Sequence, residues 1–385
     1  MKTRRCVCGT DVTHTMSADE ALEVVACPSC KRDVYFTRYE RMDIALSEYC
    51  NLKCQMCRRP SETLFMDAAV CKRVVEEAAA VGVETVSFSG GEPFVHPQIL
   101  DILEAAFSVG VKVQMVSNGT LIKEKHLELL SNLDCLTISI DGTEEAHDFI
   151  RKRKGTYRRS LQTLRLLTEK SDVQWGTNTV MQRDNYFCLY DSFKAIQEIG
   201  GFKYAYCGFS HVEVVPEIAE LQMTREQTQQ AYEQIVRIEA DCKQTNTWFN
   251  DREMLLRYFD TYAQKGKRYR PMNGCKIPQK FIGFSDHGFY LCWHQGRNIK
   301  MDSLIAALQT EVARDIVREG LEKRCVACNC FNYSWDDEWN EGIMASAQAG
   351  ESVDGVIAFK DPSRVKLRLI SGGAGNTIEM HDDGI

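Results

Sequence analysis

The sequence predicts an α/β fold built on a parallel sheet. From about residue 42 to residue 214, apolar segments with strand character alternate with segments that carry apolar residues at helical spacing. Such alternation is typical of parallel strands joined by helical crossovers. Active sites in these folds lie at the C-terminal ends of the strands. The residues that directly follow each strand are therefore the first candidates for chemistry.

Six strands and five intervening helices are expected. The strands cover residues 42–47, 83–89, 111–117, 135–140, 173–181 and 203–214. The helices cover residues 66–81, 97–108, 123–132, 157–170 and 186–199. Gly82 is expected to stop the first of these helices. Residues 224–264 are predicted to form one long polar helix with few breaks, which links the sheet to a later cysteine-rich region.

Composition limits the partners and the location. The 385 residues allow one large domain with one or two small ones. The formal net charge of -7 argues against phosphate-backbone binding, so no nucleic-acid partner is expected. No apolar run approaches the length of a membrane span, and the basic N-terminus lacks the apolar segment of a signal peptide. We therefore expect a cytoplasmic protein without a membrane partner.

Seventeen cysteines are unusual for a cytoplasmic chain, where thiols stay reduced. Twelve of them fall into three groups, which suggests metal or iron–sulfur ligation, and the other five are expected to be core residues. The early group is Cys6, Cys8, Cys27 and Cys30; the middle group is Cys50, Cys54 and Cys57; the late group is Cys275, Cys292, Cys325, Cys328 and Cys330.

The middle group has the spacing C-x3-C-x2-C and directly follows the first expected strand. Three thiolates can hold three irons of a cubane and leave the fourth iron open for a substrate or cofactor. A structural zinc site would be closed by four ligands, and the triplet has no obvious fourth cysteine nearby. The triplet is therefore predicted to bind a 4Fe–4S cluster at the functional edge of the sheet.

Further motifs follow the next strands in order. Ser89-Gly90-Gly91-Glu92-Pro93 follows the second strand, Ser117-Asn118 follows the third, and Ser139 to Asp141 lie where the fourth ends. Arg151 follows in the segment DFIRKRKGTY. Together with the cysteine triplet, this arrangement resembles the radical S-adenosylmethionine (SAM) superfamily, and its SPASM/twitch branch in particular. The resemblance covers residues 42 to about 330 and implies a partial (β/α)6 TIM-like barrel.

The resemblance also implies the cofactors and their ligands. The GGE motif would bind the methionine amine of SAM, Ser117 and Asn118 its ribose and carboxylate, and Arg151 its carboxylate, while Met56 would lie against adenine. The reduced cluster would cleave SAM to methionine and a 5'-deoxyadenosyl radical, with an external electron donor of the flavodoxin or ferredoxin type. The implied cofactor-binding residues are Met56, Ser89, Gly90, Gly91, Glu92, Pro93, Ser117, Asn118, Ser139, Asp141 and Arg151.

The late cysteines resemble a twitch domain, which carries one auxiliary 4Fe–4S cluster. Cys275 and Cys292 flank an expected hairpin with Asp286-His287-Gly288 at its turn. The preferred ligands are Cys275, Cys292, Cys325 and Cys328, with Cys330 as an alternative to Cys328. A zinc knuckle is the competing interpretation.

The early cysteines, in CVCG and CPSCK, resemble a zinc ribbon with four thiolate ligands. The C-x-C spacing of the first pair departs from the usual pattern, so an additional iron–sulfur cluster or unligated thiols stay open as alternatives. The expected segments are a metal module (1–40), a radical SAM barrel (41–220), a helical linker (221–265), an auxiliary-cluster domain (266–345) and a C-terminal extension with a mobile end (346–385).

The favoured function is a radical SAM enzyme that abstracts hydrogen from a small polar metabolite, such as a sugar, an aminocyclitol or a nucleotide-linked compound, for oxidation or dehydration. One alternative is a maturase that modifies a ribosomally made peptide, and another is a multi-cluster electron-transfer protein. Cys207, at the end of the sixth strand, is a candidate acid or hydrogen donor, although a core position is the competing interpretation. The sequence does not identify the substrate, the net reaction or the oligomeric state.

Overall fold

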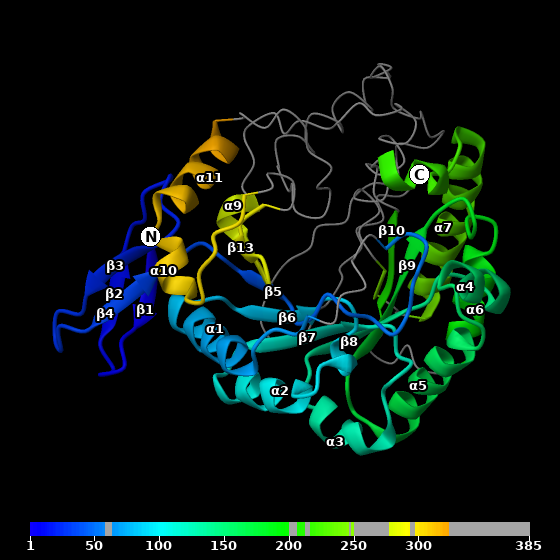
Figure 1. The fold of residues 1–385 in the computed structure, drawn as a ribbon, viewed down its shortest axis with the longest axis horizontal. Coiled ribbons are helices and arrows are strands. Elements are labelled where there is room, and N and C mark those ends of the chain that lie inside the picture. Colours follow the sequence, from blue (N-terminus) through cyan, green and yellow to red (C-terminus); the bar gives the residue numbers. More distant parts are fainter. Residues whose placement is uncertain are drawn as a thin grey trace, which may run out of the picture. The chain divides into compact units, whose positions relative to one another are not determined.

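A parallel sheet with helices on its outer face forms the centre of the structure (Figure 1). The computed structural model describes residues 1–57, 64–199, 206–211, 216–245, 248–249, 277–292 and 297–322. The chain divides into two units, residues 1–336 and 337–385, of which the second lies wholly outside the described residues. The expected C-terminal extension and Cys275, Cys325, Cys328 and Cys330 also lie outside them.

The main sheet has nine described strands in the order β11-β10-β9-β8-β7-β6-β5-β12-β13. All neighbours are parallel except β12 and β13, which are antiparallel. The strands are β5 (Arg41–Ala45), β6 (Thr85–Ser89), β7 (Lys112–Ser117), β8 (Cys135–Ser139), β9 (Trp175–Met181), β10 (Tyr206–His211), β11 (Trp248–Phe249), β12 (Phe281–Ser285) and β13 (Gly288–Tyr290). The six strands β5 to β10 confirm the α/β class and its parallel sheet.

The helices between the strands pack on one face of the sheet (Figure 1). They are α1 (Ala68–Val81), α2 (Ile99–Ser108), α3 (Leu127–Leu130), α4 (Glu144–Ile150), α5 (Thr156–Lys170), α6 (Leu189–Gln197) and α7 (Arg225–Thr245). Shorter elements are η1 (Pro93–Val95), η2 (Glu124–His126), η3 (Pro216–Leu221), α9 (Ile277–Lys280), α10 (Leu304–Leu308) and α11 (Glu311–Leu321). None of the described helices is long and apolar enough to cross a membrane.

The two faces of the sheet differ in polarity because side chains alternate along each strand. Ile44, Phe88 and Ile138 are fully buried against the helices. The neighbouring positions on the other face are polar: Asp43 on β5 pairs in register with Ser87 on β6. The sheet therefore has an apolar outer face, which forms the core, and a polar inner face.

Two expectations about elements need correction, and one helix was not expected. The polar helix ends at Thr245 instead of continuing to residue 264, because Trp248–Phe249 pairs with β10 as strand β11. The segment 123–132 forms the short turn η2 and the single helical turn α3. Helix α4 was not expected, since seven residues are too few to show a helical period.

The expected hairpin around Asp286 is present as β12 and β13. Strand β12 also pairs in parallel with β5, with Phe281 opposite Arg41, so the hairpin extends the main sheet. Local sequence patterns do not predict this pairing, because about 240 residues lie between the two strands.

Residues 1–40 form two antiparallel hairpins, β1 (Lys2–Arg5) with β2 (Asp11–His14) and β3 (Glu23–Ala26) with β4 (Asp33–Phe36). Their small buried cluster consists of Cys6, Val12, Cys27, Val34 and Phe36.

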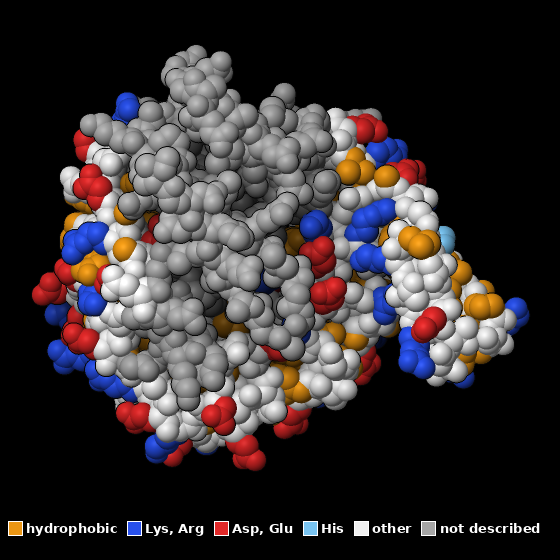
Figure 2. Space-filling view, turned by 180° about the vertical axis from the view of Figure 1, so that it is seen from behind, with side chains coloured by type: hydrophobic (Ala, Val, Ile, Leu, Met, Phe, Trp, Pro, Cys, Tyr) orange, Lys and Arg blue, Asp and Glu red, His pale blue; other side chains and the backbone are white. Residues whose placement is uncertain are grey.

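Basic and acidic side chains are interspersed over the described part of the face shown in Figure 2.

Candidate active site

The cysteine triplet lies on the loop that follows β5, as the sequence predicts. Cys50 and Cys54 are half-buried and Cys57 is exposed. The loop is anchored at Gln55, whose backbone N–H donates to Ile150 O at 2.9 Å and whose side-chain amide donates to Asp184 Oδ2 at 2.8 Å. Two contacts from one residue to distant segments fix the loop over the end of the sheet.

The glycine loop after β6 lies directly against the triplet loop. The Gly91 N–H donates to Ser47 O at 2.6 Å, and the Glu92 N–H donates to Tyr49 O at 3.1 Å. A Cβ atom on residue 91 would lie 1.9 Å from Tyr49 O, which is a backbone atom that cannot turn away. Glycine is therefore required at this position for the two loops to touch.

Glu92 joins the loops after β6 and β7. Its side chain is almost fully buried, and its carboxylate accepts from the Ser117 hydroxyl at 2.8 Å and the Asn118 backbone N–H at 2.7 Å. It also accepts from the Phe94 N–H and so caps η1. Burial raises the pKa of Glu92, although these donors oppose the shift. With its oxygens occupied, Glu92 acts here as a positioning residue.

Asn118 brings the third loop onto the triplet. Its side-chain amide donates to Asn51 Oδ1 at 2.9 Å and lies 3.8 Å from Cys50 Sγ. Asn51 in turn donates to the Thr120 hydroxyl at 2.8 Å. The sequence predicted Ser117 and Asn118 here but missed Asn51, whose position between two of the cysteines was the available signal.

Arg151 lies at the same centre and is 8% exposed. Its Nη2 is 2.5 Å from Asp141 Oδ2, and its Nη1 donates to Cys54 Sγ at 3.6 Å. Burial alone would lower the pKa of Arg151, but Asp141 and Cys54 raise it above its ordinary value. Among the described residues, the buried Nε of Arg151 has no hydrogen-bond partner.

Two of the thiols share an environment suited to a metal cluster. Burial raises the pKa of Cys50 to about 11, and it raises the pKa of Cys54 against the opposing effect of Arg151. A bound metal displaces such protons, because thiolates are the ligating form. N–H groups of Leu52 and Arg151 already point at these sulfurs, as expected around iron–sulfur ligands. The donor set and its surroundings fit a cluster held by Cys50, Cys54 and Cys57.

The remaining predicted residues occupy different positions. Ser89 and Ser139 lie half-buried at the ends of β6 and β8, and Pro93 starts η1. Met56 packs against Ile218 and Leu221. The side chain of Cys207 lies outside the described residues, and Cys292 is half-buried two residues after the end of β13.

The polar inner face carries a network that the sequence analysis missed. Arg41 donates to Asp43 Oδ1 at 2.8 Å and to Gln114 Oε1 at 3.1 Å. Burial raises the pKa of Asp43, while Arg41 opposes the shift. Arg41 and Asp43 alternate along β5 and form no recognisable sequence motif. Only the strand register shows that they lie near Gln114 on β7.

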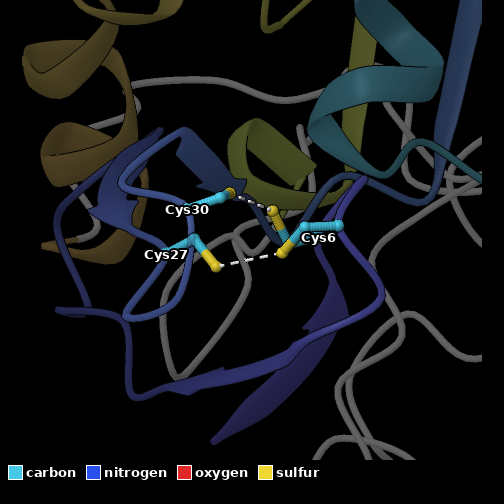
Figure 3. A group of neighbouring side chains, drawn as sticks. Cys6, Cys27 and Cys30 are labelled. Atoms are coloured by element: carbon cyan, nitrogen blue, oxygen red, sulfur yellow. Dashed lines mark hydrogen bonds between the residues drawn. The ribbon is translucent and has the colours of Figure 1, made fainter.

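The four early cysteines come together at a second site. Their ligand atoms all lie within 4.8 Å of one another. Figure 3 shows Cys6, Cys27 and Cys30 with their sulfurs directed toward a common centre. Among the described residues, these four form the group of cysteine, histidine and acidic side chains whose spacing suits a metal ion.

Comparison with known proteins agrees with this geometry. Residues 44–195 match the sequence profile of the radical SAM superfamily. The chain is 31% identical over 168 residues to an AdoMet-dependent heme synthase of Methanosarcina barkeri, covering 41% of this chain and 47% of that protein. It is 31% identical over 162 residues to the PqqA peptide cyclase of Gluconobacter oxydans, covering 40% and 45%.

A third relative is the subtilosin biosynthesis protein AlbA of Bacillus subtilis, with 29% identity over 42% of this chain and 37% of that protein. The match spans less than half the length of each of these three relatives. Among solved structures, Streptococcus suis SuiB bound to SAM has a TM-score of 0.57 at 17% identity, covering 74% of this chain and 66% of that chain. The anSMEcpe structure with AdoMet and a peptide has a TM-score of 0.56 at 18% identity, covering 76% and 88%.

Proposed function

Since residues 44–195 of this chain form a radical SAM domain, we propose that the protein reductively cleaves SAM and uses the resulting radical to modify a peptide. One observation carries the proposal. The cysteine triplet, the glycine loop, Asn118 and Arg151 come from separate strand ends and meet at one edge of the sheet. An electron carrier would need the cysteines but not the surrounding polar residues.

Cys50, Cys54 and Cys57 would hold the 4Fe–4S cluster. When reduced, the bound cluster supplies the electron that breaks SAM into methionine and a 5'-deoxyadenosyl radical. The polar groups beside the triplet would receive the amino-acid part of SAM. Arg151 offers a buried guanidinium with a free Nε to a carboxylate, and Asn118 offers an amide beside Cys50.

The chain's own contribution is positioning. Glu92 fixes the loops after β6 and β7 relative to each other, so the groups around the cofactor are held before it binds. Asp141 holds Arg151 from one side, so its guanidinium does not need to be ordered during binding. Because Asp141 and Arg151 are both buried, water is excluded from this part of the site.

A peptide substrate is favoured by the relatives. PqqA peptide cyclase acts on a peptide by its name, and two further relatives take part in subtilosin biosynthesis and in maturation of the sporulation killing factor. AdoMet-dependent heme synthases and GTP 3',8-cyclases are also among the relatives, and by their names they support the small-metabolite alternative. The auxiliary cluster, with ligands among Cys275, Cys292, Cys325, Cys328 and Cys330, and the external electron donor stay predictions. Cys207 likewise stays a candidate acid or hydrogen donor.

The first test is SAM cleavage by the full chain, reconstituted anaerobically with iron and sulfide and reduced with dithionite. We expect 5'-deoxyadenosine from the wild-type protein and none from Cys54→Ala. Cys71→Ala is the matched control, because Cys71 lies in the core on α1 and should leave cleavage intact. Undiminished cleavage in Cys54→Ala would refute the cluster assignment.

The second test concerns the substrate. The protein is co-expressed with each short peptide encoded beside its gene, and peptide mass is compared between wild type and Cys54→Ala. A mass change that requires Cys54 supports the peptide assignment. If SAM is cleaved but every such peptide keeps its mass, while a sugar or nucleotide-linked compound is converted, the substrate assignment is wrong and the radical chemistry stands.

A further inference from the structure

The two hairpin turns of residues 1–40 share a hydrogen-bonding pattern, with one additional residue in the second turn. In the turn between β1 and β2, the Cys6 N–H donates to Thr10 O and the Gly9 N–H donates to Cys6 O, both at 2.8 Å. In the turn between β3 and β4, the Cys27 N–H donates to Arg32 O at 2.8 Å, and the Lys31 N–H donates to Cys27 O at 2.9 Å. The C-x2-C pair therefore repeats the hydrogen-bonding pattern of the C-x-C pair, and the extra residue between its cysteines accounts for the longer turn.

A positive φ angle closes each turn directly after its second cysteine. Gly9 has φ 87° and Lys31 has φ 65°. Lys31 is one of two non-glycine residues with positive φ in the described part of the chain. A lysine in this region is unfavourable by itself, so the surrounding structure must hold it there. The repeated turn places the first cysteine of each pair inside the small core and the second nearer the surface.

The sulfur spacing distinguishes one metal ion from a cluster. Cys6 Sγ lies 3.4 Å from Cys30 Sγ, and Cys8 Sγ lies 3.6 Å from Cys27 Sγ. Four thiolates around one zinc ion, with Zn–S of about 2.3 Å, stand about 3.8 Å apart by tetrahedral geometry. A cubane places its thiolates on separate iron corners, which requires a wider arrangement. We propose that Cys6, Cys8, Cys27 and Cys30 bind a single Zn²⁺ ion that clasps residues 1–40 onto the end of α1.

Two residues of the hairpins that carry the cysteines make hydrogen bonds to the C-terminal end of α1. Arg4, two residues before Cys6, donates from Nη2 to Ala79 O at 3.3 Å. Thr37, directly after β4, donates to Val81 O at 3.0 Å. Helix α1 has no basic residue in its own last turn, and the Gly82 N–H already donates to Ala78 O and Ala79 O. The module therefore adds a positive charge beside Ala79 O and a hydrogen bond to Val81 O.

The metal would stabilise a module whose own core is small, in addition to the packing of Ala21, Leu22 and Tyr39 into the main core. Its buried cluster has five members, and two of them, Cys6 and Cys27, are proposed ligands. Modules of this size depend on a metal for folding. Zinc joins the hairpin that carries Arg4 to the hairpin that precedes Thr37, and so fixes both donors on α1. This inference does not depend on the proposed SAM chemistry.

The first measurement is the zinc and iron content of the full chain purified anaerobically. We expect about one zinc per chain in the wild type, and loss of that zinc without loss of iron in Cys27→Ser. Cys135→Ser, on β8, is the control and should keep the zinc. A wild type without zinc, a single iron in place of the zinc, or a Cys27→Ser variant that loses about four irons would overturn the assignment.

The second measurement is hydrogen exchange of the peptide covering residues 75–83, with the peptide covering α5 as internal reference. Exchange should be about tenfold faster after zinc is removed by a chelator, and unchanged in α5. Arg4→Met should retain zinc and still speed exchange at the end of α1, whereas Arg5→Met, at an exposed position, should not. Unchanged exchange in zinc-depleted protein would overturn the clasp.

Discussion

Asp141 and Arg151 form an ion pair inside the protein, with Asp141 Oδ2 2.5 Å from Arg151 Nη2. Asp141 is fully buried and also accepts from the Val180 N–H at 2.9 Å. The pair joins the end of β8 to the segment after α4. Its position beside Cys54 makes the arrangement of the site depend on a buried charge.

Replacing Arg151 by methionine should destabilise the protein by about 3–5 kcal/mol, because Asp141 would remain as an uncompensated buried charge. Arg153→Met is the matched control. The side chain of Arg153 is exposed and donates to Asn51 O at 3.1 Å, so its loss should cost less than about 1 kcal/mol. Urea unfolding measures both values, and equal losses would contradict the assigned role of the pair.

Gly91→Ala should prevent the close contact between the glycine loop and the triplet loop. The new Cβ would lie 1.9 Å from Tyr49 O, so we expect a cost of about 3 kcal/mol and loss of SAM cleavage. Gly110→Ala has open space around its Cβ and only the penalty of φ 77°, about 1 kcal/mol. Thermal unfolding and deoxyadenosine formation are the readouts. Normal cleavage by Gly91→Ala would show that the loops do not need to touch.

Stability should fall in mild acid because of His147. Burial, reinforced by Arg151, lowers the pKa of His147 to about 4. The folded protein keeps the ring neutral, while the unfolded chain takes up a proton below about pH 6.5. The contribution is therefore present above that pH and is lost as the pH falls toward 4.

Between pH 7 and pH 5 this difference amounts to about 2 kcal/mol. Urea unfolding of the wild type and of His147→Gln at both pH values isolates it, because the variant lacks the titrating ring. Identical acid losses in the two proteins would exclude His147 as the cause.

Asp148 should stabilise the start of α5, which has Gly155 rather than a capping side chain before its first residue. Its carboxylate accepts from the Gly155 N–H at 2.6 Å, the Thr156 hydroxyl at 2.7 Å and the Tyr157 N–H at 2.9 Å. Asp148→Ala should cost about 1–2 kcal/mol, and the exposed Glu145→Ala should cost little. Differential scanning calorimetry measures the melting temperatures, and equal values for the two variants would contradict this prediction.

The sequence predicted the parts of the site that follow strands in order. Cys50, Glu92 and Asn118 meet because parallel strands end at one edge of the sheet. The pattern of strands in the sequence showed that each of the three residues follows a strand end. Asn51 was missed as a functional position, since its role depends on a hydrogen bond to Asn118 in a distant segment that no local pattern records.

The same distinction applies to the fold. Strands β5 to β10 alternate with helices and were predictable from local periodicity. The pairing of β12 with β5, and the contact of Arg4 with Ala79, join segments that are far apart in the chain. Many apolar strands could have taken the place of β12, so only the folded structure selects the partner.

The position of β12 has a consequence for biosynthesis. Strand β5, which leads into the cysteine triplet, keeps one unpaired edge until residues 281–285 have left the ribosome. An exposed strand edge is a site of mispairing and aggregation in partly made chains. Cofactor assembly on the nascent protein would therefore take place beside an unprotected edge. Truncation before Phe281 should yield insoluble chains even though every residue of the triplet and its neighbouring loops is present.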